Sequence, residues 1–238
     1  TAAGYSNISG CWFAYADLCL DLDGVYITSV YDNIFAVAKR YWRLEDSTFG
    51  TAANQFWGNK YGTPIAGNIA DLIYIAAPGV TMFGEYWETQ QHGCTALHLA
   101  TGAVRAEVSG KLEACGDIVI DTSVEAHLQV NMDNCWKTTS NWAVRVNGGA
   151  NAYIGNSSIR LSALDAALTG ISAAGGAAVS ATDVRNFGSG VVLSSVGGVR
   201  GSQIRGCSTG VTFTSGSTAV LGVDNTFISN TTNVVNNS

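Results

Sequence analysis

Apolar and polar residues alternate in short runs along much of this 238-residue chain. Residues 118–120, 143–146 and 211–214 are clear examples, and alternation with a period of two is typical of half-buried β-strands. Residues 32–43 are interpreted as a short helix. The rest of the pattern predicts an all-β protein built from many short strands.

The pattern also repeats with a period of about twenty residues. Short units centred on Gly170, Gly190, Gly210 and Asn233 recur at nearly this interval. In the last unit Asn replaces Gly, and Asn is the other residue type that tolerates a left-handed backbone. Two apolar rows repeat with a similar period: Val179, Val199 and Val220, and Val184, Ile204 and Phe227.

A repeat of this length predicts a solenoid. Leucine-rich repeats have a similar length, but they need a Leu and Asn framework that this chain lacks. Three short strands per turn fit better, and the turns must stack because one turn cannot bury its apolar face alone. We therefore predict a single parallel β-helix whose turns lie about 4.8 Å apart.

The two parts of the chain differ in regularity. Residues 94–238 are predicted to form regular turns. Residues 1–93 are predicted to form irregular, aromatic-rich turns with inserted loops, one of them at residues 46–63. Because the chain opens at Thr1 in the middle of the pattern, we expect a fragment or a processed product.

Cysteines mark one position of successive turns. Cys94, Cys115 and Cys135 follow one another at the interval of the repeat, and Leu112 and Met132 precede the last two at the same distance. The segment from Ile8 to Cys11 begins in the same way. A ladder of buried free thiols is the favoured interpretation, with disulfides between adjacent turns as the alternative. No CxxC motif occurs, and no His or carboxylate shares this position, so no metal site is predicted.

Composition narrows the possible partners. Charged residues make up only 13% of the chain, and the formal charge is −6. No basic run is present, so nucleic-acid binding is not expected. No apolar run reaches the length of a membrane-spanning helix, so membrane insertion is not expected either.

The repeat and the segment Asn-Thr-Phe-x-x-Asn-Thr-Thr-Asn-Val at 225–234 resemble the right-handed parallel β-helices of the pectate-lyase type. Within that group the chain looks most like bacteriophage tailspike and tail-fibre proteins. The resemblance implies a homotrimer on a virion, in contact with other virion proteins and outside the host cell. It also implies binding of a host cell-surface polysaccharide, with endoglycosidase or lyase activity in many members and no cofactor.

Acidic residues are the candidates for catalysis, because glycosidases use two carboxylates. The candidates are Glu85, Glu88, Asp121 and Glu125. Each is also explained as a solvated surface acid, and Glu125 as the partner of Arg145 one turn away. The cluster of Asp17, Asp21 and Asp23 superficially resembles the acidic sites of calcium-assisted lyases, but a polar strand edge is favoured.

Aromatic residues carry the stronger binding signal, because flat rings with a polar tip stack well on sugars. The candidates lie in or near predicted loops and bends: Trp42, Trp57, Tyr61, Tyr86, Trp87 and Trp136. Packing against the helix or a subunit interface is the competing explanation for each. Three functions therefore stay open: a glycan-binding virion protein, a polysaccharide depolymerase, and a structural spike or stalk.

Overall fold

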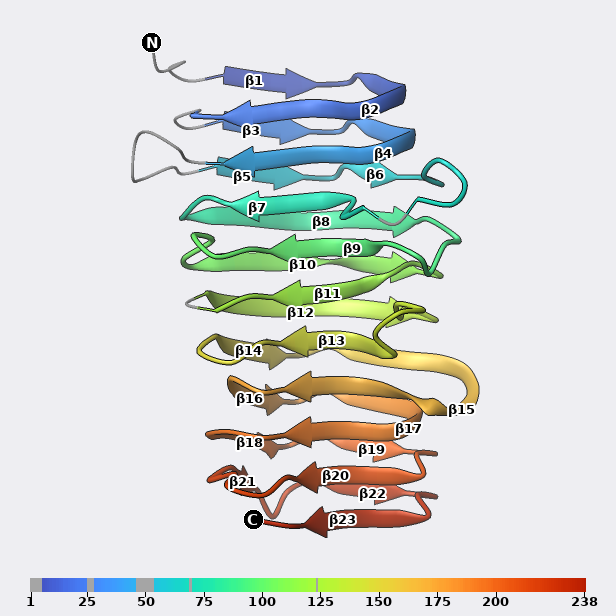
Figure 1. Cartoon of the computed structure of the whole chain (residues 1–238), viewed down its shortest axis with the longest axis vertical. Coiled ribbons are helices and arrows are strands. Elements are labelled where there is room, and N and C mark those ends of the chain that lie inside the picture. The colour runs from blue at the N-terminus through green and yellow to red at the C-terminus, as the bar shows by residue number, and fades with distance from the viewer. Residues whose placement is uncertain (1–5, 25–27, 46–53, 69, 123) are drawn as a thin grey trace.

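The computed structural model describes residues 6–24, 28–45, 54–68, 70–122 and 124–238. They form an all-β parallel solenoid of about nine turns, and these residues contain no helix. The chain enters at one end of the coil and leaves at the other (Figure 1). This confirms the predicted fold class.

The strands are short or bend between two sides of the coil. In the N-terminal half they are β1 (Ser6–Ser9), β2 (Trp12–Asp23), β3 (Thr28–Tyr31), β4 (Ile34–Glu45), β5 (Asn54–Trp57), β6 (Lys60–Tyr61), β7 (Ile73–Ala76), β8 (Val80–Glu88), β9 (Thr95–Leu99), β10 (Ala106–Glu113) and β11 (Asp117–Ile120). In the C-terminal half they are β12 (Glu125–Asp133), β13 (Trp142–Val146), β14 (Asn151–Gly155), β15 (Ser158–Ala173), β16 (Gly176–Ser180), β17 (Asp183–Leu193), β18 (Gly197–Arg200), β19 (Gln203–Arg205), β20 (Thr209–Phe213), β21 (Val220–Leu221), β22 (Thr226–Ile228) and β23 (Thr232–Asn236).

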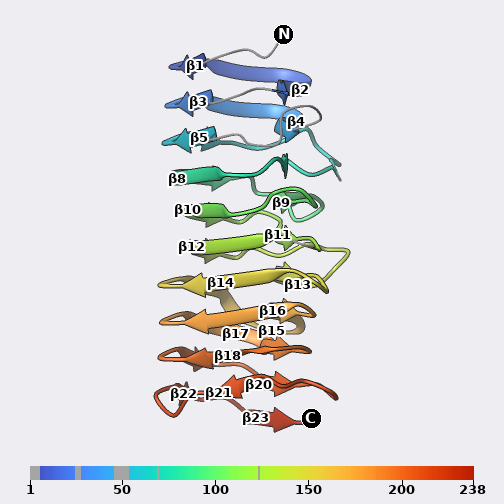
Figure 2. The same cartoon turned by 90° about the vertical axis from the view of Figure 1, so that its left-hand side faces the viewer.

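Parallel pairing arranges these strands in three ladders, seen from two sides in Figures 1 and 2. The first ladder is β1, β3, β5, β8, β10, β12, β14, β16, β18 and β21. The second is β2, β4, β6, β8, β10, β12, β15, β17, β19 and β22. The third is β2, β4, β7, β9, β11, β13, β15, β17, β20 and β23.

The core is a set of stacked rows inside the coil. One row of the second ladder runs through Phe13, Phe35, Tyr61, Trp87, Leu112, Met132, Ile159, Val184, Ile204 and Phe227. The sequence interval between successive members is uneven, so the turns vary more in length than a constant period suggests. The variation comes from the bends and from register shifts inside three strand pairs, β8 with β10, β9 with β11, and β15 with β17.

Two predicted elements are wrong or shifted. Residues 32–43 contain most of β4 instead of a helix, because Phe35 faces the core and stacks between aromatic rings of the turns on either side. Val199 pairs with Leu221, which leaves Val220 67% exposed. The predicted loop at 46–63 lies outside the described residues at 46–53, and its remainder includes β5 and β6.

Glycine repeats at one position because the next turn leaves no room for a side chain there. Gly170, Gly190 and Gly210 have no positive φ, so the need for glycine here does not come from the backbone conformation. A Cβ atom on Gly190 would lie 2.6 Å from the carbonyl oxygen of Gly210 in the next turn. A side chain at this position would therefore force the turns apart.

The predicted thiol ladder is confirmed. Cys94, Cys115 and Cys135 are buried and free, and the last two sulfur atoms lie 3.2 Å apart. Cys11 is exposed and belongs to another position, because Ile8 pairs with Val30 of the first ladder.

Candidate functional site

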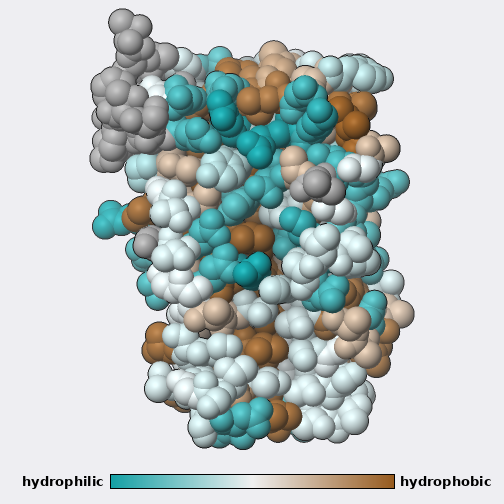
Figure 3. All heavy atoms as spheres, viewed as in Figure 1, coloured by the Kyte–Doolittle hydropathy of each residue, from teal (hydrophilic) through white to brown (hydrophobic). Residues whose placement is uncertain are grey.

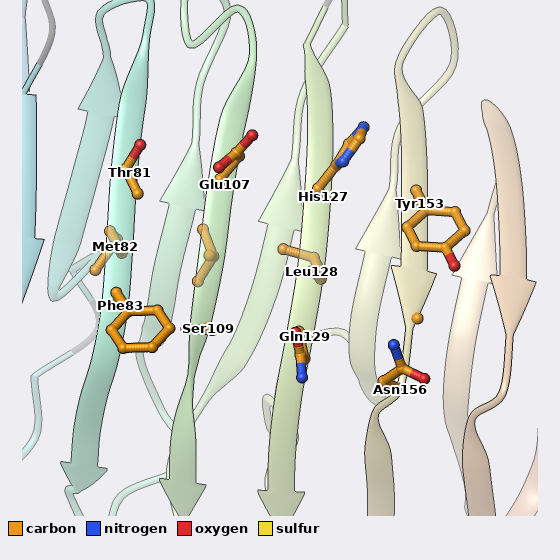
Figure 4. Close-up of a pocket in the computed structure, with 12 residues that line it drawn as sticks. Thr81, Met82, Phe83, Glu107, Ser109, His127, Leu128, Gln129, Tyr153 and Asn156 are labelled. Atoms are coloured by element: carbon orange, nitrogen blue, oxygen red, sulfur yellow. The ribbon is translucent and has the colours of Figure 1, made fainter.

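A shallow groove of about 320 Å³ crosses the outer face of the first ladder over β8, β10, β12 and β14 (Figure 4). Two rows of outward side chains from consecutive turns line it. Thr81, Glu107, His127 and Tyr153 form one paired row. The other side is lined by the paired residues Ser109 and Gln129, with Phe83 and Asn156 beyond them. Neighbouring members of a row are about 4.8 Å apart because they lie on adjacent strands.

Aromatic rings stand at both ends of the groove. Phe83 is 70% exposed and Tyr153 is 38% exposed, which is unusual for such large apolar groups. The Tyr153 ring lies along its own strand over Gly155, where a Cβ atom would come within 2.5 Å of the ring. Gly155 therefore lets the ring lie along the surface, where it can serve as a platform.

A column of outward aromatic residues continues from Phe83 toward the N-terminus. Tyr31, Trp57 and Phe83 occupy the same position in β3, β5 and β8. The rings of Tyr31 and Trp57 stack with their centroids 4.5 Å apart. Trp57, one of the predicted glycan-binding residues, is thus half-buried on the side of the coil that carries the groove.

Three other aromatic candidates are not on the surface. Trp42, Tyr61 and Trp87 are 0%, 1% and 0% exposed. They point into the coil, where Trp42 stacks on Phe56 at 4.1 Å and Tyr61 stacks on Trp87 at 5.0 Å. Their predicted contact with a ligand is wrong, because inward positions of the ladders are closed to solvent.

The two remaining aromatic candidates lie beside bends. Tyr86 lines a second hollow that shares Phe83 with the groove, and its hydroxyl donates a hydrogen bond to Glu113 at 2.7 Å. Trp136 lies in the loop after β12, where its ring stacks on His92 with centroids 4.2 Å apart. Trp136 does not line the groove.

The four acidic candidates have different surroundings. Glu85 is only 1% exposed and accepts hydrogen bonds from Tyr61 and Asn59. Burial raises the pKa of the Glu85 carboxyl to about 7, against the lowering effect of these hydrogen bonds. Glu88 points outward on the second ladder and accepts a hydrogen bond from Tyr86.

Asp121 belongs to a polar cluster on the third ladder, the face shown in Figure 3, where hydrophilic residues gather over the N-terminal half. His98 contacts Asp71 at 2.7 Å through Nδ1 and Asp121 at 2.9 Å through Nε2. Burial disfavours the charged imidazole, but the two carboxylates outweigh it and raise the pKa of His98. Asn147 donates a further hydrogen bond to Asp121, so this carboxylate is held in a closed network.

Glu125 is exposed in β12 and lines a third hollow, which shares His127 and Tyr153 with the groove. Its predicted pairing with Arg145 is wrong. Arg145 pairs with Val119 in the third ladder, and its guanidinium lies 4.4 Å from the centre of the Trp142 ring. The two residues lie on different sides of the coil.

Sequence reasoning missed Phe83, Glu107, His127 and Tyr153. Polar and apolar residues alternate strictly over Glu125–Asp133, which indicates an outward position for His127, and this residue is exposed between two buried neighbours. The other three could be found only by aligning their strands with β12.

The part of the chain that the structure describes contains no group of three or more His, Cys, Asp or Glu side chains arranged to hold a metal ion. Asp21 is paired with Arg43 through two 2.7 Å hydrogen bonds, and Asp17 with Lys39. No helix long and apolar enough to cross a membrane is present among the described residues.

In comparisons with known proteins, no family model, curated protein or solved structure matches the chain significantly. The groove combines two exposed rings, polar amides and a single carboxylate, Glu107. Such a surface can stack flat ligands and hydrogen-bond to them.

Proposed function

We propose that this protein binds an extended polysaccharide along the groove of the first ladder. The observation that carries the proposal is the exposed ring of Phe83 at one end and that of Tyr153 at the other. The faces of such rings suit the apolar faces of sugars. Between them, Gln129 and Asn156 offer amide donors and acceptors for sugar hydroxyls.

The biological setting in this proposal is attachment of a virion to a host cell-surface polysaccharide. It rests on the resemblance of the repeats to phage tailspikes and tail fibres. A homotrimer in contact with other virion proteins is part of the same proposal.

Binding to purified bacterial surface polysaccharides tests the proposal directly. Loss of one ring contact of about 50 Å² corresponds to about 1.3 kcal/mol, or roughly a tenfold weaker affinity. We expect this loss for Phe83→Ala and for Tyr153→Ala. Tyr15→Ala is the matched control, because Tyr15 is 83% exposed but lies outside the groove. Unchanged binding by both groove variants would contradict the proposal.

Cleavage of the polysaccharide is the second candidate function. Its support is that Glu107 and Glu125 line hollows that meet at His127 and Tyr153. Release of reducing ends by the wild type, abolished in Glu107→Gln and Glu125→Gln, would establish it. Binding without release would leave the protein as a glycan-binding module, and neither binding nor release would favour a structural spike.

A further inference from the structure

The outer face of the second ladder carries a segregated column of charges. Six residues occupy one outward position on six consecutive turns, three acids followed by three arginines: Glu88, Glu113, Asp133, Arg160, Arg185 and Arg205. The inward residues between them and the neighbouring row are buried, so the charged groups all point away from the core. The column therefore has an acidic half and a basic half.

The neighbouring outward row carries two charges, each opposite in sign to the column beside it. Lys111 stands beside Glu113, and Asp183 stands beside Arg185. Asp183 also accepts hydrogen bonds from Arg205, and Arg160 contacts Asp133 at the junction of the two halves. These groups keep 21–52% of their side-chain surface exposed, so they can contact a further partner.

Stacking like charges on adjacent strands is unfavourable in an isolated chain, because neighbouring groups repel one another about 4.8 Å apart. Alternating acids and arginines would pair within the chain at every step. The segregated order instead suits a surface of the opposite order. The same chain, turned end over end, presents such a surface.

We propose that two copies of this chain associate through the second ladder in antiparallel orientation. The twofold axis lies along the strands, between the turns of Asp133 and Arg160. Every charged side chain of the column then faces a side chain of opposite charge on the other copy. The facing pairs are Asp133 with Arg160, Glu113 with Arg185, Glu88 with Arg205, and Lys111 with Asp183, each occurring twice.

Parallel copies do not have this complementarity. A parallel neighbour in contact through this face at the same height places arginine against arginine and acid against acid. Parallel trimers of the kind implied by the resemblance must therefore use another face. The proposed dimer contact is separate from the main groove. A bend in β8 lies between Phe83 and the charged column, so the two surfaces lie on different sides of the coil.

The size of the face sets the strength of the contact. Six turns span about 29 Å, and a three-residue strand segment spans about 10 Å. The contact is about 290 Å² per copy, well below the roughly 800 Å² per partner of a standard interface, so the dimer is weak and sensitive to salt. Measurements therefore need high protein concentration and low ionic strength.

Sedimentation equilibrium of the whole chain is the test. We expect the wild type to be dimeric at about 0.02 M salt and monomeric at about 0.5 M. Two double variants, Glu88→Arg with Glu113→Arg and Arg185→Glu with Arg205→Glu, should each raise the dissociation constant at least about tenfold. Mixed in equal amounts, they should form a heterodimer, because all facing charges are then again opposite.

Circular dichroism and thermal melting establish that each variant is folded. If a double variant does not fold, the single variants Glu88→Arg and Arg205→Glu replace it, because both side chains lie at the ends of the charged column. A wild type that stays monomeric in low salt overturns the proposal. So does an oligomer that persists in the charge-reversed variants, or a mixture of folded variants that does not associate.

Discussion

Glu85→Gln is the substitution that most directly tests the energetics of this interior. Glu85 ends a buried column in which Asn33 donates a hydrogen bond to Asn59 and Asn59 donates to Glu85. The amide of Gln has almost the same shape and can still accept the hydrogen bond from Asn59. Unlike the carboxyl, it cannot ionise. The variant therefore isolates the effect of charge at this site.

The size of the effect follows from the pKa. The Glu85 carboxyl titrates at about 7 in the folded chain, compared with 4.5 for an unperturbed Glu. A raised carboxyl pKa means that the folded state holds the proton more tightly than the unfolded state. Its contribution to stability is complete below about pH 4.5 and is lost as the pH rises through 7. The loss is on the order of 3 kcal/mol between these limits.

Urea unfolding at several values between pH 5 and pH 8.5 measures this loss. The free energy of unfolding of the wild type should fall across the range, and that of Glu85→Gln should fall by about 2–3 kcal/mol less. Glu125→Gln is the matched control, because it makes the same chemical change at an exposed position. Parallel profiles for the wild type and Glu85→Gln would refute the reasoning.

Two further predictions concern the stacking of turns and the polar cluster. In chemical denaturation, Gly190→Ala should lower the free energy of unfolding by at least about 2 kcal/mol, because its Cβ atom would clash with the carbonyl oxygen of Gly210. Gly148→Ala is the control and should be nearly neutral, because no atom lies within 4 Å of its added Cβ atom. His98→Gln should destabilise by about 1–2 kcal/mol at pH 5 and by less at pH 8.5. The raised pKa of His98 means that the charged contact with Asp71 is present at low pH and lost as the pH rises, so a constant difference across pH would contradict this prediction.

Much of the fold was predictable where the turns are nearly equal in length. The predicted units around Gly170, Gly190, Gly210 and Asn233 lie in one ladder, with their flanking residues paired in register. Val184, Ile204 and Phe227 pair as predicted, as do Leu112 and Met132. In these turns the bends differ little in length, so counting along the sequence is enough to align the strands.

Two of the binding candidates that are buried, Tyr61 and Trp87, lie where counting along the sequence does not align the strands. They share one buried row with Leu112, but the turns that separate these three residues are longer than those of the C-terminal half. Because the bends absorb the extra residues, period alone could not show that these rings face inward. For the same reason the sequence did not show that Phe83 points outward, which follows from its register with Trp57.

By itself, the sequence determined that this chain forms an all-β coil with stacked rows of Cys, Gly and aliphatic residues. A repeated pattern of inward positions specifies such a coil whatever the exact length of each bend. Only the tertiary structure decided which aromatic and charged side chains meet on the outside. Those neighbours come from different turns, and their register depends on the length of every bend between them.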